Sequence, residues 1–189
     1  MDIRYSVGPE ELKTLSTDEL RKKYLIEEIF VDNGLTVTYC NDDRIMVLGA
    51  KPLDAKVEIN ISDEIGSDFF LQNREMAVIN IGGEGTIILD GVEHEMVQYD
   101  GMYIGKGTKE IAFTSKDKEN PAKFYMNSAT AHRNYPTVLI QYDDANHKPL
   151  GSLEDCNKRT INQYIHDEVF ARLSERDGVE YGSCQLAMG

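Results

Sequence analysis

Two glutamates with glycines at short intervals around them are the residues of this sequence whose types and spacing could do chemistry. Glu75 precedes Gly82 by seven positions, and Glu110 ends the segment GKGTKE. Two carboxylates in one pocket could act as general acid and base, or could hold a hard cation. The alternative is that Glu75 forms a structural ion pair with Arg74 or Lys109. Both roles depend on the elements that position these side chains.

Those elements are expected to be short antiparallel strands. Between residues 75 and 127, apolar and polar residues alternate and the alternation breaks at glycines, which is typical of strands joined by tight turns. The pair Asp90-Gly91 lies between two alternating runs and predicts a two-residue hairpin. So many short strands predict an all-β sandwich or barrel. The expected strands are residues 35–39, 44–51, 56–61, 69–73, 75–81, 85–90, 92–96, 102–104, 109–114 and 123–127.

The pattern divides the chain into three regions. Residues 1–34 are expected to hold a short helix within 9–28, capped by Ser16 or Thr17, and an entry strand. Residues 35–136 form the predicted barrel. Residues 137–189 are expected to be a linker and the start of a second domain, with a strand at 159–165 and a helix at 167–175. The apolar run in the final segment SCQLAMG leads us to expect that this domain continues further.

Composition restricts the partners and the compartment. The formal net charge of −13 and the pI of about 4.7 disfavour binding to nucleic acid or to anionic membranes. The first residues contain no apolar run of the kind found in a signal peptide, and no segment approaches the ~20 apolar residues of a membrane span. The three cysteines do not suggest a disulfide framework. We therefore expect a reduced, cytoplasmic protein.

The glycine-rich frame resembles that of the cupins, which are double-stranded β-helix barrels that hold a metal ion in the barrel mouth. Their first motif runs through two histidines, a glutamate and a glycine, and their second is Pro-x-Gly-x-x-His. Glu75 and Gly82 match the first motif, and Glu110 stands at the histidine position of the second. The resemblance therefore predicts a degenerate barrel that binds no metal. The two histidine positions of the first motif fall at Asp68 and Phe70, or at Phe69 and Leu71.

The four histidines do not replace these ligands, since no two of them are spaced as ligands on one element. A lone histidine is more often a hydrogen-bonding surface residue. His132 has the strongest claim to a role, because it is close to Tyr125 and Arg133 near the predicted strand ends, where pockets form.

Several segments resemble the N-terminal part of the 5-keto-4-deoxyuronate isomerase family, whose members are bicupins. They occur in the order of that family and extend over nearly the whole chain. The segment at residues 171–183 departs from the family pattern and resembles an insertion. The matching segments are TLSTDELRKKYLIEEIFV, NREMAVINIGGEGTIILDG, YIGKGTKEIAF, NPAKFYMNSATAHRNYPT, KRTINQYI and CQLAMG.

The resemblance implies ketol isomerisation of 5-dehydro-4-deoxy-D-glucuronate to 3-deoxy-D-glycero-2,5-hexodiulosonate in pectin and uronate degradation. In the family, zinc is bound by histidines and a glutamate of the C-terminal half, and no residue here matches those ligands. We therefore expect this chain alone to be inactive and the full-length relatives to be homo-oligomers. The catalytic residues stay unassigned. The candidate pocket residues are Arg74, Glu75, Lys106, Glu110, Tyr125 and His132, with Lys123 and Arg133 as further cations for a substrate carboxylate.

A second hypothesis is a non-catalytic cupin module that assembles with a partner or binds a sugar acid without converting it. The two hypotheses differ in whether a zinc-binding His-x-His-x4-Glu segment follows residue 189. A sugar-sensing regulator is a weaker alternative, because no DNA-binding element is visible.

Overall fold

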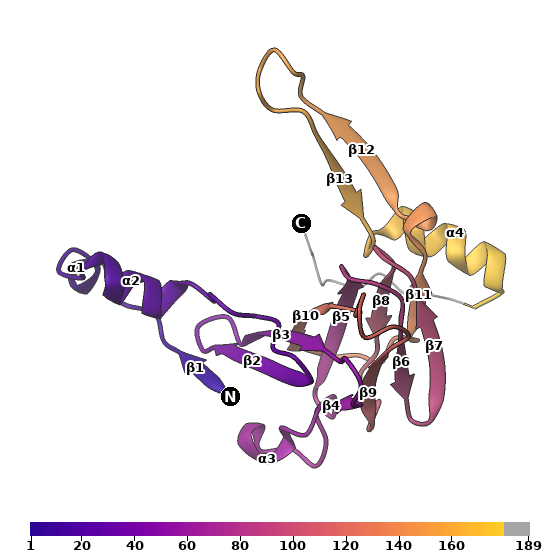
Figure 1. The fold of residues 1–189 in the computed structure, drawn as a ribbon, viewed down its shortest axis with the longest axis horizontal. Helices are drawn as coiled ribbons and strands as arrows, with labels where there is room; N and C mark the ends of the chain where they lie inside the picture. The colour runs from indigo at the N-terminus through magenta and orange to yellow at the C-terminus, as the bar shows by residue number, and fades with distance from the viewer. Residues whose placement is uncertain (180–189) are drawn as a thin grey trace.

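The computed structural model describes residues 1–179, and its central feature is a pair of β-sheets (Figure 1). The large sheet has the strand order β1-β2-β3-β10-β5-β8-β11, and the small sheet has the order β4-β9-β6-β7. From β3 to β10 the chain passes back and forth between the two sheets, apart from the hairpin of β6 and β7 within the small sheet, in the manner of a double-sheet jelly roll, the architecture of the cupins. Their bounds are β3 Ile45–Lys51, β4 Val57–Glu58, β5 Arg74–Asn80, β6 Gly85–Leu89, β7 Val92–Met96, β8 Gly101–Ile104, β9 Ile111–Ser115 and β10 Phe124–Thr130.

The predicted all-β cupin-like fold is therefore confirmed, with two facing sheets in place of one continuous barrel. The hairpin predicted at Asp90-Gly91 joins β6 to β7, with Leu89 paired to Val92. Gly91 has a φ of 84° and Asp90 a φ of 48°, as a tight hairpin turn requires. One expected strand is wrong, because residues 69–73 form turns rather than a strand.

The main core fills the space between the two sheets. Met76 and Val78 of β5 and Phe124 of β10 come from the large sheet, whereas Ile87 and Phe113 come from the small sheet, and all five are fully buried. The rings of Phe113 and Phe124 lie 5.1 Å apart, which joins the sheets directly. Alternate residues of a strand point to opposite faces, so every second residue of β5 faces this core.

Three further strands extend the large sheet beyond the jelly roll. They are β1 (Asp2–Arg4), β2 (Gly34–Cys40) and β11 (Val138–Ile140). Strand β1 pairs in parallel with β2, and β11 pairs antiparallel with β8. Because β11 belongs to the same sheet as the jelly roll, the large sheet continues past the boundary expected at residue 136.

The N-terminal helical region consists of two short helices rather than one. These are α1 (Pro9–Leu12) and α2 (Thr17–Tyr24). The side chain of Ser16 accepts a hydrogen bond from the Glu19 backbone N–H, and the Glu19 carboxylate accepts one from the Ser16 backbone N–H. This capping box fixes the start of α2 at the expected serine. A third short helix, α3 (Ser62–Ile65), precedes β5.

A second core lies on the outer face of the large sheet, where α4 (Asp167–Asp177) packs. Val169, Phe170 and Leu173 of α4 are buried there, and the ring of Phe170 lies 6.4 Å from that of Tyr103 on β8. The helix expected at 167–175 is confirmed and covers this face. The first half of the insertion-like segment 171–183 is therefore helical, and residues 180–183 lie outside the described part.

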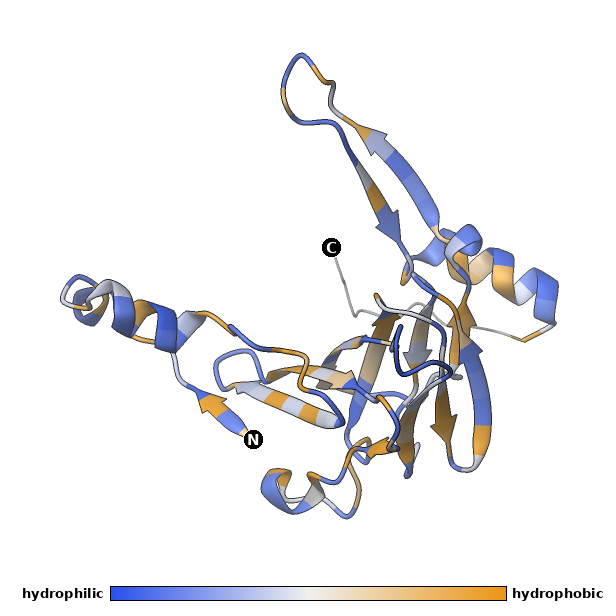
Figure 2. Cartoon of the chain, in the orientation of Figure 1, coloured by the Kyte–Doolittle hydropathy of each residue, from blue (hydrophilic) through white to orange (hydrophobic). Residues whose placement is uncertain are grey.

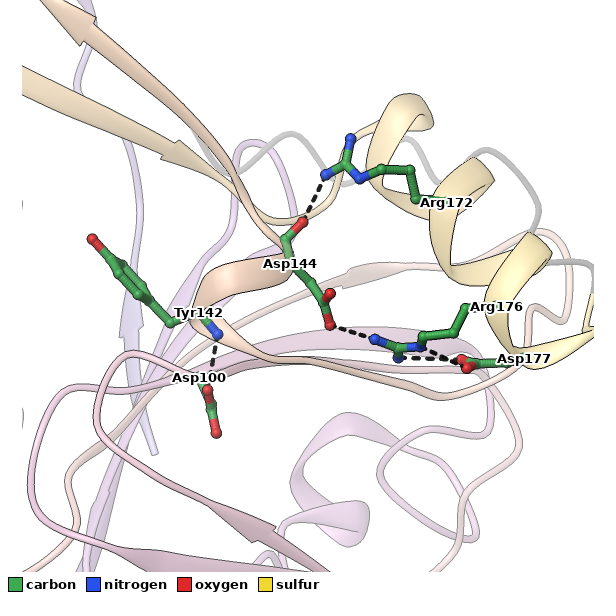
Figure 3. Close-up of polar contacts among 6 residues, drawn as sticks. All are labelled: Asp100, Tyr142, Asp144, Arg172, Arg176 and Asp177. Atoms are coloured by element: carbon green, nitrogen blue, oxygen red, sulfur yellow. Dashed lines mark hydrogen bonds and ion pairs between the residues drawn. The ribbon is translucent and has the colours of Figure 1, made fainter.

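Polar contacts hold α4 against the 3-10 turn Tyr142–Asp144 (Figure 3). Arg172 donates a hydrogen bond to the Asp144 carbonyl oxygen at 2.7 Å, and Arg176 pairs with the Asp144 carboxylate at 2.7 Å. The turn itself is tied to the large sheet, because the Tyr142 backbone N–H donates to Asp100. These contacts link α4 to the turn, alongside the buried apolar side chains that pack the helix on the sheet.

The hairpin of β12 (Asn146–Leu150) and β13 (Arg159–Gln163) projects from the body (Figure 1). Most of its side chains are exposed, and it is mostly hydrophilic, as Figure 2 shows. The strand expected at 159–165 is present as β13. The polar stretch 143–158, which the sequence suggests is loop-like, supplies part of the 3-10 turn and all of β12, and residues 151–158 form the loop of the hairpin.

Candidate functional site

The candidate site is a pocket of about 320 Å³ between one end of the large sheet and the α3 segment. Tyr39 of β2, Met46 of β3 and Arg74 of β5 line it from the sheet, and Ser67 and Phe70 line it from the segment after α3. In Figure 1, α3 and β1 lie on the same side of the molecule. Phe70 is one of the positions at which the cupin frame would place a histidine, whereas neither Glu75 nor Glu110 of that frame lines the pocket.

Arg74 is the charged residue most deeply buried in this pocket wall, with 7% of its surface exposed. Its Nε donates to the Ser128 hydroxyl at 3.0 Å, and its Nη2 donates to the carbonyl oxygens of Ser128 and Arg44, both at 2.7 Å. Burial lowers the pKa of the guanidinium, and nearby Tyr39 acts in the opposite direction. Because Arg74 is in phase with Met76 and Val78, it projects into the space between the sheets.

Glu75 points to the other side of the sheet. It is buried, and its carboxylate accepts a hydrogen bond from the Tyr103 hydroxyl at 2.8 Å. Tyr103 belongs to the second core, under α4. Adjacent residues of a strand face opposite sides, so the expectation that Glu75 pairs with Arg74, or lies in the barrel mouth, is wrong.

Glu110 lies elsewhere. It is exposed just before β9 of the small sheet, and its backbone N–H donates to Asp90 at 2.8 Å. The small sheet faces the inner side of the large sheet, whereas Glu75 is on the outer side. The structure therefore does not bring the two glutamates together, and it offers no support for an acid–base pair between them.

The remaining candidates are dispersed. Tyr125 is partly buried on β10, and its hydroxyl donates weakly to Asn127 at 3.4 Å. Lys106 is half-buried in the turn after β8. His132 and Arg133 are exposed in the turn after β10, and Lys123 immediately precedes that strand. Of the candidates named from the sequence, only Arg74 lines the pocket beside α3.

Sequence reasoning missed Tyr39 and Ser67 as pocket residues. The Ser67 hydroxyl oxygen is buried without a hydrogen-bond partner among the described residues. The alternation along residues 74–80 could have placed Arg74 on the inner face, because it shares parity with Met76 and Val78. No comparable signal exists for Ser67, which follows a four-residue helix in a stretch without periodicity.

The described residues do not provide a site for zinc. Among residues 1–179, no three histidine, cysteine, aspartate or glutamate side chains gather as metal ligands. The pocket wall beside Arg74 carries a fixed positive charge, which opposes a cation. Cys40 and Cys156 are free thiols. In the described part of the chain, no helix has the length and apolar character needed to cross a membrane.

The strand order and the pocket together define a cupin-type jelly-roll protein. Residues 43–174 match the model of the KduI/IolB family, and the chain belongs to this family.

Curated relatives agree with this assignment. The chain is 47% identical over 191 residues to 4-deoxy-L-threo-5-hexosulose-uronate ketol-isomerase of Pectobacterium carotovorum subsp. carotovorum, and the match extends over all of this chain and 65% of that protein. It is 43% identical to the protein of the same name from Lachnoclostridium phytofermentans, over all of this chain and 64% of that protein. The chain thus spans less than two thirds of the length of these relatives.

Solved structures with a similar fold are more distant. A cupin protein from Bacteroides fragilis matches 47% of this chain and 67% of its own, with 19% identity and a TM-score of 0.35. The Cnp3 cupin domain of Schizosaccharomyces pombe matches 51% of this chain and 64% of its own, with 12% identity and a TM-score of 0.38. The fold assignment rests on the strand order rather than on these scores.

Proposed function

We propose that this chain is the N-terminal part of a 4-deoxy-L-threo-5-hexosulose-uronate ketol-isomerase. The observation that carries the proposal is its 47% and 43% identity to two proteins of that name, over its whole length. The substrate is then the linear keto-uronate released when lyases cleave pectin, and the product is 3-deoxy-D-glycero-2,5-hexodiulosonate. The enzyme is proposed to be cytoplasmic and homo-oligomeric.

Such a reaction needs a base that removes a proton next to a carbonyl, and an electrophile that stabilises the enediolate oxygen. We propose that neither role is filled within residues 1–179. Glu75 is on the outer face of the large sheet and Glu110 is exposed just before β9, and the described residues form no metal-ligand cluster. The chemistry is therefore assigned to the part of the enzyme that the relatives possess beyond this match, with zinc proposed to act there.

The second candidate is a non-catalytic cupin module. The observation in its favour is the same dispersion of Glu75 and Glu110, because a folded jelly roll that lacks an acid–base pair can still bind or assemble. On this view the chain binds a sugar acid or a partner and converts nothing.

The experiment is an assay of the native gene product, purified from its source and weighed intact. The keto-uronate is prepared by lyase digestion of oligogalacturonate, and its conversion is followed by proton NMR. The proposed function expects conversion, with the Pectobacterium relative as the positive control. Absence of conversion by a folded native product, under conditions in which the control is active, would favour the non-catalytic module.

A further inference from the structure

The pocket beside α3 contains polar groups with unused hydrogen-bonding capacity. The buried Ser67 hydroxyl oxygen has no partner in the described part of the chain. Arg74 uses Nε and Nη2 for its hydrogen bonds, and no described residue bonds to its Nη1. Buried polar groups are nearly always satisfied by protein, water or ligand. Both residues line the same pocket, so a polar ligand there could bond to both.

The charge of Arg74 is also uncompensated. Among the described residues, no carboxylate lies within ion-pair distance of the guanidinium, whose hydrogen bonds go to two carbonyl oxygens and one hydroxyl. A buried charge without a counter-ion is costly. The one acidic residue in the pocket wall is Glu64, whose side chain is 48% exposed and lies 4.0 Å from the N-terminal amine.

We propose that this pocket binds a small monocarboxylate between Arg74 and Ser67. Three of the five N–H groups of the guanidinium bond to protein oxygens, so the two on Nη1 can donate to a carboxylate, whose negative charge also compensates that of Arg74. The N-terminal amine and Glu64, which both line the pocket, carry opposite charges, so Arg74 leaves one net positive charge, which a monocarboxylate matches better than a dianion such as phosphate. A volume of about 320 Å³ is at the lower end of small-molecule pockets and suits a ligand of monosaccharide size.

The carboxylate class follows from the pocket alone, whereas the choice of a hexuronate as probe rests on the proposed function. Carboxylate binding in the pocket and the proposed isomerase function can therefore be refuted independently of each other. Binding of D-galacturonate is measured on the 189-residue chain without any turnover, so a loss of isomerase activity does not affect the readout. A positive binding result likewise leaves the isomerase assay to be decided on its own.

The experiment is a titration of the isotope-labelled chain followed by NMR, including the Arg74 Nε–H resonance. D-galacturonate is compared with D-galactose, its neutral counterpart, and with inorganic phosphate. We expect saturable shifts at Arg74 and Ser67 with the uronate and none with the neutral sugar. Equal shifts with galactose, or tighter binding of phosphate than of the uronate, would overturn the proposal.

Three variants sharpen the test. Arg74→Lys keeps the charge but has three N–H donors in place of five, so none remains for the ligand once the contacts with Ser128 and Arg44 are made, and we expect at least ~10-fold weaker binding. Arg159→Gln removes an exposed arginine of the projecting hairpin, outside the pocket, and is expected to leave binding unchanged. Glu64→Gln removes the opposing charge at an exposed position, so it keeps the fold and should strengthen binding about 2- to 5-fold. If Arg74→Lys does not fold, Glu64→Gln still decides, because unchanged or weaker binding in that variant contradicts the proposal.

Discussion

Arg74 and Glu75 are adjacent in sequence, yet their side chains lie on opposite faces of the large sheet. Arg74 lines the pocket beside α3 from the inner face, whereas Glu75 accepts a hydrogen bond from Tyr103 on the outer face. The period of a strand makes this separation obligatory. The spacing of the glycines pointed to strand β5 and to Glu75 on it. The residue of β5 that lines the pocket is Arg74, one position earlier.

Asn80 is the buried polar residue on which several turns depend. Its Nδ2 donates to the carbonyl oxygens of Gly83 and Met96 at 2.7 and 3.2 Å, and its Oδ1 accepts from the Gly82 and Lys123 backbone N–H groups at 3.1 and 3.2 Å. It is completely buried. The side chain therefore joins the turn after β5 to the ends of β7 and β10.

Replacing Asn80 by alanine is expected to lower the free energy of unfolding by about 3 kcal/mol, because backbone groups would be left buried without partners. Chemical denaturation of the two proteins measures the difference. The matched control is Asn60→Ala, an exposed asparagine whose side chain makes, among the described residues, a single weak hydrogen bond of 3.4 Å to Glu58. If Asn80→Ala lowers the free energy of unfolding no more than Asn60→Ala does, the structural role given to Asn80 is contradicted.

Tyr164 makes stability depend on pH in the alkaline range. Burial raises the pKa of its phenol to about 12, and its hydroxyl donates to the Tyr99 carbonyl oxygen. Below pH 10 the Tyr164 phenol is neutral in both the folded and the unfolded state, so it does not change the free energy of unfolding as pH varies. Between pH 10 and about 12 the unfolded state loses this proton first, so stability falls as pH rises.

We expect Tyr164→Phe to show a shallower fall in the free energy of unfolding between pH 10 and 12 than the wild type. Denaturation at several pH values measures the slope, and absorbance at 295 nm follows tyrosine ionisation. Identical slopes in the two proteins would show that Tyr164 ionises normally when folded.

At the scale of elements, the jelly roll could be predicted from the sequence in large part. Alternation and the Asp90-Gly91 turn located β5, β6 and β7 almost to the residue, because each has one face on the core and one on solvent or the second core. The prediction of a strand at 69–73 was wrong, because a short apolar run such as the FFL of residues 69–71 can be buried in a turn as readily as in a strand. The pocket formed by distant segments could not be inferred from local periodicity.

Helix α4 is expected to be stabilised mainly by its apolar side chains and only slightly by the arginine contacts with Asp144. Leu173 is 2% exposed, and Leu173→Ala should cost roughly 2–4 kcal/mol of unfolding free energy. The Arg176–Asp144 pair is partly exposed and is expected to contribute less than ~1 kcal/mol.

Denaturation and amide hydrogen exchange in α4 check this expectation. The control is Leu153→Ala in the projecting hairpin, where the leucine is 73% exposed and the change should cost less than ~0.5 kcal/mol. If Leu173→Ala and Leu153→Ala lower the free energy of unfolding by similar amounts, α4 does not pack on the outer face of the large sheet.

At the scale of the whole molecule, the acidic, elongated chain presents apolar side chains to solvent at its extremities. Tyr5 is 62% exposed and Leu153 is 73% exposed, one near the N-terminus and the other in the projecting hairpin. An isolated hairpin is marginally stable in water, so we expect it to be covered by another copy of the chain. Light scattering after gel filtration should give a mass above the 21.4 kDa of one chain. A stable monomer would contradict this expectation.

The measurement that tests the central claim most directly is isomerase turnover by the 189-residue chain with and without the portion of the Pectobacterium relative that lies outside the match. That portion is supplied in trans. We predict no conversion of the keto-uronate by either piece alone and conversion by the two together. Conversion by the 189-residue chain alone would contradict the account, because it would place the catalytic groups among residues that the structure does not bring together.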